Sequence, residues 1–264
     1  MNKNNLFLKI SVALGYVAMI LVNYLANALP IGGVSTGQAS DAYANLFTPA
    51  GITFSIWGLI YISLLAYTIY QFFPIKNESD FDKEKTFFNI NKYYLVTSIA
   101  NIAWIFAWHY GIIWLSVIIM LTLLFFLIKI ADIINKQNYS KAETVLILLP
   151  FSLYFGWITV ATIANITVFL VSIGWNGFGI ADTTWTIIVL IIGAVIGITR
   201  ILKDKNIFYG LVLVWAYGGI WLKHTSISGF NGEYQNIITT IIICIISFLL
   251  TIGFLKVKSS LNRL

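Results

Sequence analysis

The chain has 264 residues, of which 59% are hydrophobic and only 10% are charged, and its formal net charge is +6. Soluble domains carry about 25% charged residues, so this composition excludes an ordinary soluble protein and indicates one that lives in a lipid bilayer. The sequence lacks the segments of alternating apolar and polar residues that a membrane β-barrel requires. Helices satisfy their own backbone hydrogen bonds in lipid, so we expect an all-α fold, a polytopic membrane helical bundle.

The helices are predicted from apolar runs, because a bilayer core requires about 20 apolar residues per helical span. Polar breaks separate eight such runs, which predicts about eight transmembrane helices. They lie at about 8–29, 51–73, 93–109, 111–130, 144–170, 184–199, 206–222 and 236–255.

Two loops follow the first two spans. The first span ends at "ANALP", which resembles a signal-peptidase site, but its apolar stretch is long for a signal peptide, so we expect an uncleaved helix. Residues 30–50 are rich in small residues and carry one charge, Asp41; they form either a lid over the mouth of the bundle or a flexible external loop. Pro49 is expected in the first turn of the second helix, where its missing N–H costs nothing. Residues 74–92 mix acids with lysines and are interpreted as a solvated connector.

Three spans carry a stripe of aromatic, polar and small residues on one helical face. Two interpretations remain open. The stripes either pack the helices together through close contacts and hydrogen bonds, or line an apolar pocket for a flat hydrophobic molecule. The stripe residues are Trp57 and Tyr61 in the second span, Asn101 and Trp104 in the third, and Tyr154, Trp157, Ala161 and Asn165 in the fifth.

Other features of the spans have simpler interpretations. In the seventh span, Trp215 lies near mid-depth and either extends the pocket or fills the core. Gly193 and Gly197 form a GxxxG spacing, which favours internal packing over a possible homodimer. Tryptophans near the outer boundary are explained by the aromatic belt of membrane proteins and need no special function. These are Trp108, Trp114, Trp175, Trp185 and Trp221.

The positive charges predict the orientation of the chain. With the amino terminus inside, fifteen of the sixteen lysines and arginines fall on the cytoplasmic side, and only Lys223 falls outside. Positive-inside insertion produces this asymmetry and places both termini in the cytoplasm. The charge is thus explained without nucleic acid, and the Asn, Lys and Ile content favours a bacterial inner (cytoplasmic) membrane.

The chemistry of the sequence favours binding over catalysis. There is no metalloprotease motif, phosphate-binding loop or catalytic-triad signature, so we assign no catalytic residue and no metal ligand. No acidic residue lies inside a predicted span, which disfavours ion-coupled transport. His109 and His224 lie near the outer boundary, where a structural role is favoured.

The stripe residues resemble motifs of the TspO/MBR family, the tryptophan-rich sensory or translocator proteins, which have five membrane helices. The fifth helix of the family reads Y-x-x-W-x-x-F-A-x-x-x-N, matched here by Tyr154, Trp157, Ala161 and Asn165, with Val160 in place of the phenylalanine. The remaining matches are Pro49, Trp57 and Tyr61 for the second helix, and Asn101 and Trp104 for the third.

The resemblance covers roughly residues 1–170, which we interpret as a TspO-like five-helix bundle, while residues 171–264 supply three additional transmembrane helices. The loop before the second span, "NLFTPAG", departs from the family because it has one proline and no tryptophan. Ligand contacts made by that loop in the family are therefore not carried over to this chain.

The resemblance implies a binding pocket for a porphyrin, another tetrapyrrole or a sterol-like lipid, with a sensory or transport role. In this interpretation Trp57 and Trp157 are pocket indoles, Ala161 allows close approach, and Asn101 and Asn165 are polar anchors. The expected partners are a hydrophobic small molecule and the lipid bilayer; no cofactor is required beyond a possible porphyrin ligand. The alternatives are a membrane enzyme that degrades or modifies a porphyrin-type ligand, or a passive transporter or scaffold.

Overall fold

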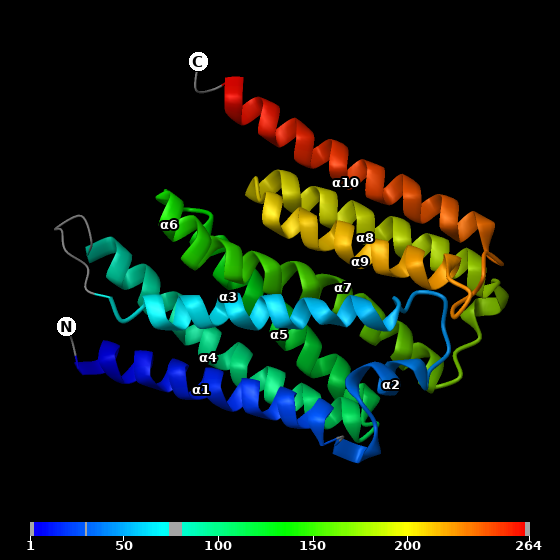
Figure 1. Cartoon of the computed structure of the whole chain (residues 1–264), viewed down its shortest axis with the longest axis horizontal. Coiled ribbons are helices and arrows are strands. Elements are labelled where there is room, and N and C mark those ends of the chain that lie inside the picture. The colour runs from blue at the N-terminus through cyan, green and yellow to red at the C-terminus, as the bar shows by residue number, and fades with distance from the viewer. Residues whose placement is uncertain (1–2, 30, 74–80, 262–264) are drawn as a thin grey trace. The chain divides into compact units, whose positions relative to one another are not determined.

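A computed structural model describes residues 3–29, 31–73 and 81–261 of the chain (Figure 1). Helices joined by turns and irregular loops make up this described part, and no residue in it forms a strand. The predicted all-α, polytopic helical bundle is therefore confirmed. The helices belong to two compact units. Unit 1 comprises Met1–Ala39 and Trp57–Ile158, and unit 2 comprises Ser40–Ile56 and Thr159–Leu264.

Unit 1 is built around its longest helix, α4, which packs against both α1 and α5. Its last helix, α7, is preceded by a single turn of π-helix, η4, and begins in unit 1 but ends in unit 2. The elements are α1 (Lys3–Ala28), η1 (Ile31–Gly33), α2 (Thr36–Asp41), α3 (Ile56–Tyr70), α4 (Phe81–His109), α5 (Ile113–Ile134), α6 (Lys141–Glu143), η4 (Thr144–Leu148) and α7 (Leu149–Ser172).

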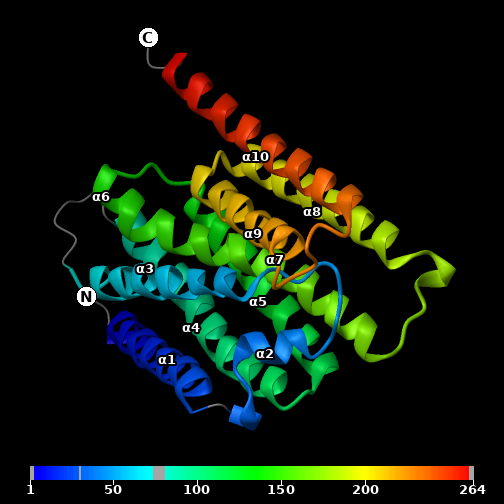
Figure 2. The same ribbon diagram turned by 45° about the vertical axis from the view of Figure 1, so that its right-hand side comes forward.

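Unit 2 contains three long helices that lie side by side in both ribbon views (Figures 1 and 2). The last helix packs against the other two, and the short helix η2 packs against α9. The elements are η2 (Gly51–Ser55), the second part of α7, η5 (Gly177–Gly179), α8 (Asp182–Asp204), α9 (Ile207–Thr225) and α10 (Gln235–Leu261).

All eight predicted spans are helical, but they are not equally apolar. Within the described residues, six helical segments are long and apolar enough to cross a membrane. Helices α4 and α9 fall outside this set, because α4 carries polar residues such as Asn101 and His109 along its apolar stretch and α9 ends on Lys223 and His224. The six segments are Asn5–Ala28, Gly51–Tyr70, Ile113–Ile134, Lys141–Ser172, Asp182–Asp204 and Gln235–Lys258.

Two local predictions differ from the structure. Helix α4 begins at Phe81, so the second half of the expected connector 74–92 is helical; residues 74–80 lie outside the described part. Charges are tolerated in a helix that extends beyond lipid, and Asn5 Nδ2 donates to Glu84 Oε1 at 2.6 Å. Pro49 is not in a first helical turn, because η2 starts at Gly51 with Ala50 as its N-cap.

The GxxxG glycines serve packing within unit 2. A Cβ atom at Gly193 would lie 2.6 Å from the hydroxyl of Tyr217, and one at Gly197 would collide with Leu213. The Tyr217 hydroxyl donates to the carbonyl of Leu190 at 2.7 Å, and its ring packs on Phe248 of α10. Close approach of α8, α9 and α10 therefore depends on these two glycines.

The predicted outer loop is ordered in two parts, one in each unit. In unit 1, the Trp108 indole donates to the carbonyl of Thr36 at 3.2 Å. The His109 ring bonds the carbonyl of Ile31 at 2.9 Å and the hydroxyl of Thr36 at 3.0 Å. These contacts fasten residues 31–36 to the end of α4, so both histidine nitrogens have a structural use.

Candidate functional site

Unit 1 brings together several of the predicted site residues in an aromatic cluster, defined here as Trp57, Tyr61, Asn101, Tyr154 and Trp157. Trp57 stacks on Tyr61 with ring centroids 5.2 Å apart. Its other contacts are edge-on, at 5.9 Å to Tyr154 and 6.2 Å to Trp157. Stacked and edge-on contacts at these distances are favourable for aromatic pairs, so the rings stabilise one another's packing.

Asn101 ties the cluster to α1. Its side-chain nitrogen donates to the Tyr154 hydroxyl at 3.3 Å, and its oxygen accepts from Asn23 Nδ2 at 2.7 Å. Asn101 and Tyr154 are both 0% exposed. A buried amide with partners on two other helices stabilises one arrangement of the bundle, because any other arrangement leaves a polar group unsatisfied.

The remaining predicted residues lie elsewhere. Trp104 stacks on Trp108 with centroids 5.4 Å apart, one turn further along α4. Ala161 and Asn165 follow on α7 in unit 2, where Asn165 is buried.

Two cavities in unit 1 are lined by residues outside the cluster. One, of about 420 Å³, lies against α1 and α3 and includes Tyr16 and Phe72; the other, of about 20 Å³, includes Tyr139 and Glu143.

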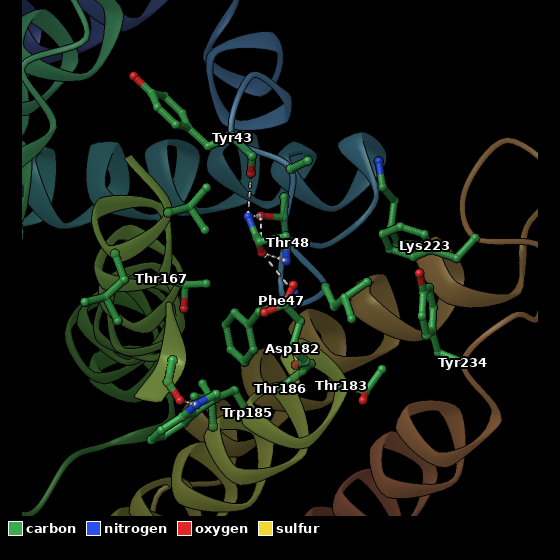
Figure 3. Close-up of a pocket in the computed structure, with 18 of the residues that line it drawn as sticks. Tyr43, Phe47, Thr48, Thr167, Asp182, Thr183, Trp185, Thr186, Lys223 and Tyr234 are labelled. Carbon is green, nitrogen blue, oxygen red and sulfur yellow. Dashed lines mark hydrogen bonds between the residues drawn. The ribbon is translucent and has the colours of Figure 1, made fainter. Parts of the chain in front are cut away.

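A third cavity belongs wholly to unit 2 and has a volume of about 680 Å³ (Figure 3). This volume lies within the range of about 300–1,000 Å³ that holds small organic ligands. Its lining comes from residues 40–48, the end of α7, the turn before α8, the start of α8, and the connection from α9 to α10. The lining residues are Ser40, Asp41, Tyr43, Ala44, Asn45, Leu46, Phe47, Thr48, Thr167, Leu170, Val171, Trp175, Gly177, Ala181, Asp182, Thr183, Trp185, Thr186, Val189, Lys223, Phe230 and Tyr234.

Residues 40–48 form one wall, which we call the roof segment. The Asn45 side-chain oxygen accepts from the backbone N–H groups of Phe47 and Thr48, both at 2.9 Å, and its nitrogen donates to the carbonyl of Tyr43 at 2.8 Å. This Asx-type turn fixes a segment with little regular helix. Phe47 is 1% exposed, so its ring anchors the segment in unit 2.

Helix α9 holds the roof segment and the residues that follow it. His224 Nε2 lies 2.9 Å from the carbonyl of Leu46, which makes this nitrogen the donor. The Ala50 N–H donates to the carbonyl of Gly219 at 3.0 Å, and the Trp215 indole donates to the carbonyl of Thr53 at 2.9 Å.

The turn between α7 and α8 supplies a tryptophan pair. Trp175 and Trp185 have ring centroids 5.1 Å apart and planes inclined at 57°. The Trp185 indole donates to the carbonyl of Gly177 at 2.7 Å, which fixes the ring against its own turn (Figure 3). Gly177 has φ +61°, and a Cβ there would lie 2.9 Å from the indole, so only glycine fits this close approach.

The connection between α9 and α10 supplies a second aromatic pair. Phe230 and Tyr234 have ring centroids 5.3 Å apart and planes at 84°, and both pack against the ring of His224. The hydrogen bond to Glu233 raises the pKa of the Tyr234 hydroxyl, and the negative charges of Glu233 and Asp182 act in the same direction. The phenol therefore stays protonated and donates a hydrogen bond to the Glu233 carboxylate.

Charged groups lie at the mouth of the cavity. Lys223 Nζ is 3.3 Å from Asp41 Oδ1, which links the end of α9 to the roof segment. Asp182 is exposed in the first turn of α8, where the helix dipole favours a carboxylate. The cavity thus combines apolar and aromatic walls with a polar rim, an arrangement suited to binding an amphipathic molecule. Among the described residues, no group of three His, Cys, Asp or Glu could hold a metal ion.

Sequence reasoning missed this cavity. It assigned Trp175 and Trp185 to the membrane-interface belt, and it treated Lys223 only as an exception to the charge rule. Two features of the sequence could have indicated the cavity. The turn "WNGFGIADTTW" places two tryptophans around glycines and an acid, and the outer cation Lys223 complements Asp41, the single charge of residues 30–50.

Comparison with known proteins identifies a family. No curated protein and no solved structure matches the chain. A family model described as TSPO-like protein matches residues 9–254, which include the helices of both units. The chain therefore belongs to the TSPO-like protein family.

Proposed function

We propose that this membrane protein binds a planar hydrophobic molecule in the cavity of unit 2 and acts as a sensor or carrier for it. The observation that supports the proposal is the cavity itself, about 680 Å³ in volume, with a tryptophan pair on one side and a polar rim. A flat apolar ligand would cover the ring faces, and its polar groups would face the polar rim of the cavity. A porphyrin-type molecule or a sterol-like lipid belongs to this class.

Family membership supports a membrane protein of the TspO type, and the ligand class follows from that resemblance. The aromatic cluster of unit 1 is the alternative location for the ligand. There, Trp57 packs against the rings of Tyr61, Tyr154 and Trp157, so a guest would have to separate rings that are now packed together. The unit 2 cavity requires no such rearrangement.

We also propose that the protein lies in a bacterial inner membrane with both termini in the cytoplasm. Fifteen of its sixteen lysines and arginines are in segments that this orientation places inside. The roof segment and the turn before α8 then face the outer side, so the ligand enters the cavity from outside the cytoplasm or from the outer leaflet.

The test is a titration of the detergent-solubilised protein with protoporphyrin dimethyl ester, an uncharged flat probe, monitored by quenching of tryptophan fluorescence. We expect saturable quenching, which Leu170→Trp weakens roughly tenfold because the larger side chain fills the cavity. Trp57→Phe serves as the matched change in the aromatic cluster and should leave the affinity unchanged. Loss of affinity in Trp57→Phe alone would instead place the ligand in unit 1, and quenching that never saturates would contradict binding altogether.

The same complex separates binding from turnover. Under illumination, the absorption band of the bound porphyrin should decay no faster than that of the free porphyrin in the same detergent. Faster decay that requires the protein would identify the alternative, a membrane enzyme that modifies its ligand.

A further inference from the structure

We infer that the cavity of unit 2 selects a ligand that carries a positive charge, namely an amphipathic organic cation with a flat aromatic body and an amine or ammonium group. This inference rests on the proposed function and specifies the charge of the ligand: it removes free-acid porphyrins, whose propionates are anionic, from the proposed ligand class. It is drawn from the charges and ring faces that line the cavity.

The charges of the lining sum to a negative value. Three charged side chains line the cavity, Asp41, Asp182 and Lys223. Lys223 pairs with Asp41 at 3.3 Å, so those two charges compensate each other. The Asp182 carboxylate makes no ion pair with any residue that the structure describes, and it lines the same cavity as Trp185 and Tyr234 (Figure 3). It is therefore the free charge that a ligand meets.

Two neighbours modify the charge of Asp182. The N-terminus of α8 contributes about half a positive charge, which offsets part of the carboxylate. Glu233, next to Tyr234, adds a further negative charge near the rim, although it does not line the cavity itself. The Tyr234 hydroxyl responds to this field, since the carboxylates of Glu233 and Asp182 both raise its pKa. The rim between α8 and α10 is therefore negative.

The ring faces favour the same sign of charge. Aromatic rings present negative faces, and tryptophan binds cations most strongly. Trp175 and Trp185 are inclined at 57°, while Phe230 and Tyr234 stand nearly perpendicular at 84°. Rings at such angles turn different faces toward one volume, which is the arrangement of an aromatic cage for ammonium groups. Asp182 lies three residues before Trp185 on α8, so carboxylate and indole lie on the same side of the helix.

An anionic ligand is disfavoured by the same groups. Its natural partner, Lys223, is already bonded to Asp41, so an anion would have to displace that carboxylate and leave it unpaired. The anion would also approach Asp182. A cation meets neither obstacle.

The experiment uses three probes of nearly equal shape: 9-aminoacridine, which is a cation, acridine, which is neutral at mildly alkaline pH, and acridine-9-carboxylate, which is an anion. Each is titrated into the full chain in a non-ionic detergent at low salt, with protein-free micelles as the partition blank. We expect the cation to bind roughly tenfold more tightly than acridine and the anion more weakly than acridine. Added salt should reduce the difference in affinity between the cation and the anion, because it screens their interactions with the charged rim.

Three charge variants locate the effect. Asp182→Asn should abolish most of the preference for the cation, and Lys223→Gln should increase it because Asp41 is then free. Asp132→Asn in unit 1 makes the same chemical change away from the cavity. It should leave the affinities for all three probes unchanged. Because Asp182 is exposed and Lys223→Gln predicts a change of opposite sign, misfolding of one variant cannot imitate the result.

The outcomes distinguish the two proposals. If protoporphyrin dimethyl ester binds saturably but none of the three acridines does, the proposed binding function stands and the inferred preference for a cation is wrong; if the ester does not bind either, the proposed function fails. If all three bind with equal affinity, or if the anion binds most tightly, the cavity binds ligands but the inferred preference for a cation is wrong.

Discussion

The two units contain similar aromatic residues but use them differently. In unit 1, the rings of Trp57, Tyr154 and Trp157 come from facing helices and pack against one another, with Asn101 bonded among them. In unit 2, Trp185 is bonded to the carbonyl of its own turn, and Phe230 packs on His224 behind it. Both rings also line the cavity of unit 2. Aromatic residues on facing helices therefore pack into the core of unit 1, whereas aromatic residues in or next to the connections between helices line a cavity in unit 2.

The largest expected effect tests the packing role of the unit 1 cluster. Trp157 is 3% exposed, and replacing it with alanine should lower the free energy of unfolding by about 3–5 kcal/mol. The measurement is unfolding in mixed micelles of detergent and sodium dodecyl sulfate. Trp114, which is 57% exposed, provides the control, because Trp114→Ala removes little buried contact. A Trp157→Ala protein of normal stability that no longer binds ligand would reverse our comparison of the two units.

The next effect concerns the contact between α9 and η2, the short helix that follows the roof segment. A Cβ at Gly219 would collide with the side chain of Thr53, whereas one at Gly218 would meet nothing within 4 Å. Gly219→Ala should therefore destabilise the protein by about 1–3 kcal/mol through overpacking. Gly218→Ala should be neutral or stabilising by up to about 1 kcal/mol, since alanine favours helix. Equal thermal stabilities of the two variants in detergent would show that this contact does not hold residues 40–56 in place.

A smaller effect is expected inside the roof segment. Asn45→Ala removes the acceptor for the N–H groups of Phe47 and Thr48, which should cost about 1 kcal/mol of stability and weaken ligand binding several-fold. Asn45→Asp keeps that acceptor and should retain most of the affinity, measured by the same fluorescence titration. If Asn45→Ala binds ligand as well as the unaltered protein, the roof segment does not shape the cavity.

The smallest expected change in stability is at the mouth of the cavity. The Lys223–Asp41 pair is partly exposed, and such pairs contribute about 0–1 kcal/mol. Lys223→Gln should therefore change the thermal midpoint very little, even though we expect it to change the charge preference of the cavity. A large loss of stability would mean that the pair fastens the roof segment rather than only setting the charge of the rim.

The sequence predicted the helices well because their main cause is local. Apolar runs and the membrane requirement were sufficient to locate eight helical segments, and the 100° repeat placed Trp57 and Tyr61, or Tyr154 and Trp157, on shared faces. The start of α4 was wrong by about three turns, because charged residues 81–92 were taken for a loop although Asn5 supports the helix there.

The cavity could not be predicted in the same way, because it depends on contacts distant in sequence. Leu46 bonds to His224, and Asp41 bonds to Lys223, so the roof segment is positioned by residues about 180 positions away. Hydropathy also assigned Trp175 and Trp185 by depth alone. Their orientation depends on the positive φ angle of Gly177 and on the hydrogen bond that this carbonyl accepts.

The division of the chain has a consequence for how this protein can be taken apart. The polypeptide passes between the units three times, after Ala39, after Ile56 and after Ile158. No single cut yields either half as a continuous fragment. A chain shortened after residue 170 would keep residues 40–56 but lose α9, whose backbone and His224 they bind. Reconstitution from pieces would therefore require the short stretch 40–56 to be supplied as a separate peptide together with residues 159–264.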